Sequence, residues 1–188
     1  MTGREDSDVK IFKPSKKADK DGGMLSFVEG MNYHRQNGNV DKAKELGKGL
    51  ALSYHNENNQ IVKLSSNVFM TEPFFPQVCT LMLFSIEAAL NYYLPSQQLS
   101  TIAINAFHEE LSSDSLPLYE TAMASPAFSF YYLSVRKGGD NIPKDIGEAF
   151  AMLCHRENDV DFIDEGKSIY TQVLAEISKR IVDEKFEN

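Results

Sequence analysis

The sequence predicts an all-α fold, and two observations support this prediction. From Met24 onward, apolar residues recur at the three- and four-residue spacing that lines one face of a helix. No segment shows the strict alternation of a half-buried strand, and short turn signals separate the periodic segments. We therefore expect about eight helices joined as short antiparallel hairpins, in a single domain over residues 23–188. An irregular bundle and a short array of repeated hairpins both satisfy this pattern.

Composition and charge narrow the class of protein. The chain has 188 residues, of which 42% are hydrophobic and 24% are charged, as in an ordinary globular domain. Residues 1–22 differ, because basic and acidic side chains are interleaved there with few apolar ones, and we expect a disordered charged tail. The net charge is −8, and no Lys or Arg occurs between Lys63 and Arg136. Nucleic acid is therefore not expected as a partner, since phosphate binding needs clustered cations.

The first half of the domain begins with three expected helices. Met24–Gln36 and Asp41–Tyr54 show helical spacing on either side of the turn signal Asn37-Gly38-Asn39. Gln60–Met70 is a weaker helical segment that Ser65-Ser66-Asn67 interrupts. The sequence therefore predicts a helical pair followed by a less regular helix.

The segment from Gln77 to Leu94 is the most apolar part of the chain and lies between two prolines. It is barely long enough to span a membrane, and it carries Glu87. A carboxylate in mid-span costs about 2.5–3.5 kcal/mol on insertion scales. We therefore predict a buried core helix and no membrane span.

Cap residues delimit the helices of the second half. Ser125-Pro126, an N-cap followed by proline at the first helical position, opens one helix, and Gly138 ends it after two cations. The helices expected here run from Ser96 through Leu111, from Leu116 to Ala124, from Pro126 to Lys137, from Pro143 to about His155 and from Asp159 to about Phe186.

Two segments share a pattern of small and aromatic residues. In GMNYHRQNGNVDKAKELGKGLAL, which begins at Gly30, Tyr33 lies on the first helix and Gly38 in the turn. YYLSVRKGGDNIPKDIGEAFAML, which begins at Tyr131, repeats the theme with an aromatic helix and a Gly-Gly turn. Together these segments, about 60 residues, resemble hairpins of the tetratricopeptide repeat family and its Sel1-like variant. Both turns are longer than in the family, and the chain between them shows no clear copy. The resemblance implies a helical module that binds a protein or peptide.

Common catalytic and metal-binding motifs are absent from the sequence. Gly166-Lys167-Ser168 matches only the end of a phosphate loop, because Asp161 stands where the motif needs glycine. His108-Glu109-Glu110 begins like a helical zinc-protease motif, but Ser112 occupies the second histidine position. We therefore assign no catalytic residue, no metal ligand and no cofactor, and a non-enzymatic role is favoured.

Glu87 and Asn91 share one face of the apolar helix, one turn apart. A buried carboxylate needs a partner or takes up a proton. Three interpretations follow: a polar seam bonded to a neighbouring helix, a ligand or proton-handling site in an internal cavity, or a stripe that faces solvent. Tyr132 and Arg136, also one turn apart, could present a peptide-binding face, although core packing explains the aromatic helix equally well.

The leading functional hypothesis is a cytoplasmic interaction module that binds a protein or peptide in a helical groove. The main alternative is a small-molecule-binding or enzymatic domain with its site beside Glu87 and Asn91. A third possibility is a homo-oligomer in which the apolar Val78–Leu94 helix forms the subunit interface. The cytoplasmic location follows from Cys79 and Cys154, which lie in apolar contexts and are expected to be buried, reduced thiols.

Overall fold

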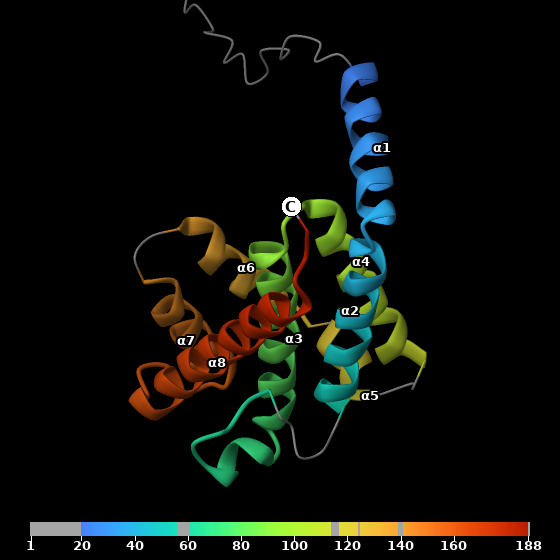
Figure 1. Ribbon diagram of the computed structural model, residues 1–188. Coiled ribbons are helices and arrows are strands. Elements are labelled where there is room, and N and C mark those ends of the chain that lie inside the picture. Colours follow the sequence, from blue (N-terminus) through green and yellow to red (C-terminus); the bar gives the residue numbers. More distant parts are fainter. Residues whose placement is uncertain (1–19, 56–60, 114–116, 124, 139–140, 188) are drawn as a thin grey trace, which may run out of the picture.

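A computed structural model describes residues 20–55, 61–113, 117–123, 125–138 and 141–187 (Figure 1). Within these ranges the chain is mostly helical and forms no strand, which confirms the all-α prediction. The elements are α1 (Lys20–Gln36), α2 (Asn39–His55), the 3-10 helix η1 (Asn67–Met70), α3 (Phe75–Tyr93), α4 (Gln97–Ser113), α5 (Pro117–Met123), α6 (Ala127–Lys137), α7 (Ile142–Leu153) and α8 (Val160–Glu184). The predicted tail falls outside the described residues as far as residue 19, and residues 20–22 belong to α1.

Helix α3 is the centre of the fold. Figure 1 shows α2 and α4 on one side of it, α6 and α7 on the other, and α8 crossing it. Residues 78–86 are all buried, as expected of a helix that is apolar on every face. The prediction of a buried core helix at Gln77–Leu94 is therefore confirmed, and the hypothesis that this helix forms a subunit interface stays a prediction. No helix among the described residues combines the length and apolarity needed to cross a membrane.

Two helix pairs, α2 with α4 and α7 with α8, pack with their backbones almost in contact at glycines. A Cβ on Gly47 would lie 2.2 Å from the Ala103 carbonyl oxygen, and one on Gly147 would lie 2.3 Å from the Ile163 oxygen. A Cβ on Gly166 would lie 2.6 Å from Phe150 Cβ. Only glycine allows helices to approach this closely, so these positions fix both crossings.

The prediction of a helix at Gln60–Met70 is wrong for residues 61–66. This segment is irregular, and α8 supplies its hydrogen-bond partners. The Gln172 amide accepts from the Lys63 N–H at 2.9 Å and donates to the Lys63 carbonyl at 3.1 Å. The Ser65 N–H donates to the Glu165 carboxylate at 3.1 Å. Because these side chains satisfy the backbone, the segment needs no helix, and only η1 forms.

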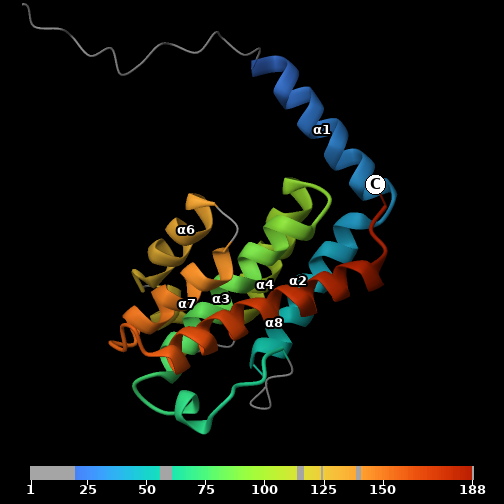
Figure 2. The ribbon, with the colours of Figure 1, turned by 90° about the vertical axis from the view of Figure 1, so that its left-hand side faces the viewer.

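The first helical pair also differs from the expected antiparallel hairpin. Figures 1 and 2 show α1 and α2 following one another end to end, and α2 packs instead against α4. Gly38 has a φ of +78° in the connection, and the Asn39 N–H donates to Asn37 Oδ1 at 3.1 Å. This two-residue turn redirects the chain without reversing it. The resemblance to the repeat family stays a prediction.

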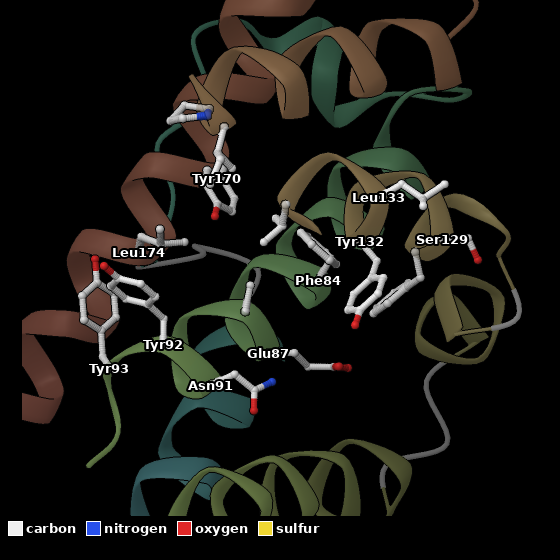
Figure 3. A pocket seen from close by; sticks show the side chains of 15 residues that line it. Phe84, Glu87, Asn91, Tyr92, Tyr93, Ser129, Tyr132, Leu133, Tyr170 and Leu174 are labelled. Carbon is white, nitrogen blue, oxygen red and sulfur yellow. The ribbon is translucent and has the colours of Figure 1, made fainter. Parts of the chain in front are cut away.

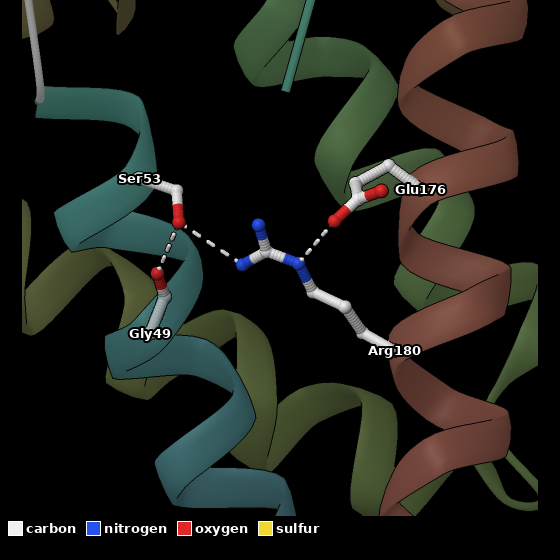
Figure 4. Close-up of polar contacts among 4 residues, drawn as sticks. All are labelled: Gly49, Ser53, Glu176 and Arg180. Carbon is white, nitrogen blue, oxygen red and sulfur yellow. Dashed lines mark hydrogen bonds and ion pairs between the residues drawn. The ribbon is translucent and has the colours of Figure 1, made fainter. Parts of the chain in front are cut away.

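Helix α8 is tied to α2 by polar contacts near its C-terminal end (Figure 4). Arg180 Nε donates to Glu176 at 2.8 Å, and its NH1 group donates to Ser53 Oγ at 3.0 Å. Beyond the helix, the Asn39 amide donates to the Glu187 carbonyl at 2.7 Å and accepts from its N–H at 3.0 Å. With α7 against its first half, α8 is held at both ends, and this fixes the position of its middle section.

Candidate functional site

A pocket of about 1020 Å³ opens between α3, α6, α7 and α8 (Figure 3). Its walls are mainly aromatic and aliphatic side chains, with a few polar groups among them. The lining residues are Phe84, Glu87, Ala88, Asn91, Tyr92 and Tyr93 from α3; Phe128, Ser129, Tyr132, Leu133 and Val135 from α6; Ile142 and Pro143 from α7; and Tyr170 and Leu174 from α8. A concave apolar site with a few polar groups is typical of ligand-binding pockets.

Helix α6, which is rich in aromatic residues, forms one wall of the pocket and also packs into the core behind that wall. Tyr131 is fully buried and its ring lies 5.3 Å from that of Phe84, while the Phe128 ring lies 6.0 Å from Phe84. Tyr132 and Leu133 follow on the open side of the helix and are 60% and 52% exposed. Tyr131 therefore lies in the core and Tyr132 lines the pocket, and a peptide-binding role for Tyr132 stays a prediction.

Three of the four residues singled out in the sequence line this one pocket. Glu87, Asn91 and Tyr132 come from two helices, and Figure 3 shows the Tyr132 hydroxyl pointing toward the Glu87 carboxylate. Arg136 is exposed in the last turn of α6 and is not part of the lining. The sequence suggested Glu87 with Asn91 as one site and Tyr132 with Arg136 as another. The structure places the first three in one pocket and leaves Arg136 outside it.

Glu87 is linked to two other helices by a chain of hydrogen bonds. Its Oε1 lies 2.9 Å from His108 Nε2 on α4, and His108 Nδ1 lies 2.9 Å from the Tyr119 hydroxyl on α5. The side chains of Glu87 and His108 are 26% and 21% exposed. Burial, and then the negative charge of Glu87, raise the pKa of Tyr119. Glu87 therefore belongs to a polar seam between helices and to the pocket at the same time.

Asn91 is also held by a neighbouring helix. Its Oδ1 accepts a short hydrogen bond from Ser100 Oγ on α4, which is itself almost fully buried. This contact uses the amide oxygen and leaves the amide NH₂ as a donor. Asn91 and Glu87 thus place one donor and one acceptor along the same wall.

Three tyrosines gather at the end of the pocket where α3 meets α8. Tyr92 is 78% exposed, its ring lies 4.9 Å from that of Tyr93, and Tyr170 is buried opposite them. Burial, followed by the proximity of Tyr93 and Tyr92, raises the pKa of Tyr170, so its phenol stays neutral. These tyrosines, together with His108 and Tyr119, were not predicted as site residues. The available signal was the pair Tyr92-Tyr93 directly after Asn91, but only the folded structure places this pair beside α8.

The two cysteines are free and buried, and burial raises the pKa of Cys79 to about 11 and of Cys154 to about 12, so both thiols stay protonated. Over the part of the chain that the structure describes, no group of three or more His, Cys, Asp or Glu side chains could hold a metal ion. The pocket itself offers hydroxyl, amide and carboxylate groups on an apolar background.

Comparisons of this chain with protein-family models, with curated proteins and with solved structures find no match.

Proposed function

We propose that the protein is a helical interaction module and that its pocket takes apolar side chains from a segment of a partner protein. The observation that carries this proposal is the exposed apolar rim: Tyr92, Tyr132 and Leu133 line the pocket and are 78%, 60% and 52% exposed. Large apolar side chains left in contact with water around a concavity are typical of protein-binding surfaces, where tyrosine often dominates the binding energy. The buried free cysteines support the cytoplasmic location that belongs to this proposal.

A small organic ligand is the second candidate, and the dimensions of the pocket favour it. Its volume of about 1020 Å³ is close to the upper end of the range for small-molecule sites. Glu87 and Asn91, each fixed by a partner on α4, would orient such a ligand as the few polar groups of binding pockets do.

Selection from a random peptide library on the intact protein tests the leading proposal. Peptides that bind should lose about tenfold or more in affinity on Tyr132→Ala, because tyrosine at the centre of an interface commonly contributes more than 1 kcal/mol. Affinity is measured by fluorescence anisotropy, with the helix content of each variant checked by circular dichroism.

Phe130→Ala is the matched control for this experiment. Phe130 lies on the same helix, is 43% exposed and does not line the pocket, so its removal should leave the affinity unchanged. Arg136→Ala should behave in the same way. Peptides that depend on Phe130 and not on Tyr132 would show that binding occurs elsewhere. A library that yields no binder, together with a drug-like compound whose affinity depends on Tyr132, would favour the second candidate.

A further inference from the structure

The charge of the pocket is carried by a single residue. Among the described residues that line it, Glu87 alone has a charged side chain, and no Lys or Arg occurs anywhere between Lys63 and Arg136. A carboxylate in an apolar site without a cationic neighbour attracts a cation more strongly than it would in water, because the surrounding dielectric is lower. The partner's chemistry is therefore constrained by charge as well as by shape.

A chain of hydrogen bonds fixes the Glu87 carboxyl group from behind. Glu87 Oε1 lies 2.9 Å from His108 Nε2, and His108 Nδ1 lies 2.9 Å from the Tyr119 hydroxyl. An imidazole with its proton on Nε2 can donate to Oε1 and accept from the Tyr119 O–H at Nδ1, so both contacts are compatible with a carboxylate at Glu87. Among the described residues, none donates to Glu87 Oε2.

The walls of the pocket beside Glu87 also favour the binding of a cation. Phe84, Phe128 and Tyr132 line the same pocket as Glu87, and the faces of aromatic rings attract cationic groups. The C-terminal end of α3 lies at the pocket through Tyr92 and Tyr93, where the helix dipole is negative. The first turn of α7 opposes this effect, but a helix N-terminus carries only about half a unit charge, against the full charge of Glu87.

We infer that the partner segment presents a cationic nitrogen, from a lysine or arginine side chain beside an apolar residue, to the free Oε2 of Glu87, and that His108 is the positioning residue that holds Glu87 for it. This inference rests on the proposed function, because it names the chemistry of the partner in the same pocket. An ammonium or guanidinium group would donate to Oε2 while its apolar neighbour fills the aromatic cavity.

Three probes of equal size separate charge from apolar contact: phenylbutylamine, phenylbutanol and phenylbutyrate. Each is titrated into the intact protein, and affinities are taken from the shifts of pocket-residue signals in heteronuclear NMR spectra. The amine should bind about tenfold more tightly than the alcohol, since a hydrogen bond to a charged group commonly contributes this much. Glu87→Gln should remove this preference, so that the amine and the alcohol bind with similar affinity, and circular dichroism checks that the variant is folded.

Variants at His108 test its positioning role. His108→Phe removes the donor to Glu87 and should reduce the preference for the amine without changing the affinity for the alcohol, whereas loss of structure would weaken both. His108→Gln can still donate to Glu87 and should restore part of the preference. An unchanged preference in His108→Phe would overturn the positioning role.

The outcomes distinguish this inference from the proposed function. Equal binding of the amine and the alcohol, tighter binding of phenylbutyrate, or a preference that survives in Glu87→Gln would overturn the inference while the pocket remained a binding site. If none of the probes shifted pocket signals at millimolar concentration, the proposed binding site itself would be contradicted, and the inference with it.

Discussion

Helix α8 packs directly against α7 along one part of its length and lines the pocket along the next. We call the first part the closed crossing and the second the open region. Near its N-terminus, Ile163 and Gly166 meet α7 with almost no space between the backbones. One to two turns later, Tyr170 and Leu174 line a pocket of about 1020 Å³. One helix contributes to both regions: glycines bring α7 and α8 together in the first, and larger side chains of α3, α6 and α8 line the pocket in the second.

The largest expected effect comes from adding one carbon to the closed crossing. In Gly147→Ala the new Cβ would lie 2.3 Å from the Ile163 carbonyl oxygen, and a backbone atom cannot move aside as a flexible side chain can. The two helices must separate, so we expect the free energy of unfolding to fall by about 3 kcal/mol, at the upper end of overpacking costs. Urea denaturation followed by circular dichroism measures this change.

Gly49→Ala provides the matched control in another helix interior. A Cβ at Gly49 meets nothing within 4 Å, so only the higher helix propensity of alanine acts, and stability should rise by up to about 1 kcal/mol. If both alanine variants shifted stability in the same direction, the close contact at Gly147 would not be what closes the crossing.

The closed region could be predicted only in part from the sequence. The helices α6 and α7 were predicted because Ser-Pro, Gly138 and Pro143 are strong local signals, and α3 because its residues are apolar on every side. The helix predicted at Gln60–Met70 is wrong for residues 61–66 because the backbone partner of this segment, Gln172, lies more than one hundred residues away. Local propensity carries no information about such a distant partner.

The open region was predicted as two separate sites and not as one pocket. Glu87, Asn91 and Tyr132 were each recognised from helical spacing, which determines neighbours on one helix only. Their common pocket depends on how α3, α6 and α8 pack, and so does the pairing of Glu87 with His108. Arg136 shares a helix face with Tyr132, but it lies in the last turn of α6, where a cation is favoured by the helix dipole and by water.

The thiol at the end of the closed crossing should make stability depend on pH. Cys154 follows α7, and burial raises its pKa to about 12, whereas an unfolded thiol ionises near pH 8.5. Above that pH the unfolded state releases a proton that the folded state keeps. Stability should therefore be constant below about pH 8 and fall above it, by at most about 1.4 kcal/mol per pH unit for this thiol.

Urea denaturation at intervals between pH 7 and pH 10 measures this dependence, with Cys154→Ala as the comparison. The variant is expected to be less stable at every pH because a buried side chain is shortened, but its stability should fall less steeply above pH 8. Parallel curves for the two proteins would mean that Cys154 is accessible to water in the folded state. Its reaction with a thiol reagent at pH 8 would then be fast as well.

The smallest effect on stability is expected when a side chain is enlarged in the open region. Ala88 lines the pocket, so the larger side chain of Ala88→Leu has space available and should change the free energy of unfolding by less than about 0.5 kcal/mol. Ala151→Leu makes the identical substitution at a fully buried position of α7 and should cost about 1–3 kcal/mol. The binding of phenylbutanol should respond in the reverse order, weakened by Ala88→Leu and unchanged in folded Ala151→Leu. Equal costs at the two positions would mean that the pocket is as tightly packed as the crossing, and the contrast along α8 would disappear.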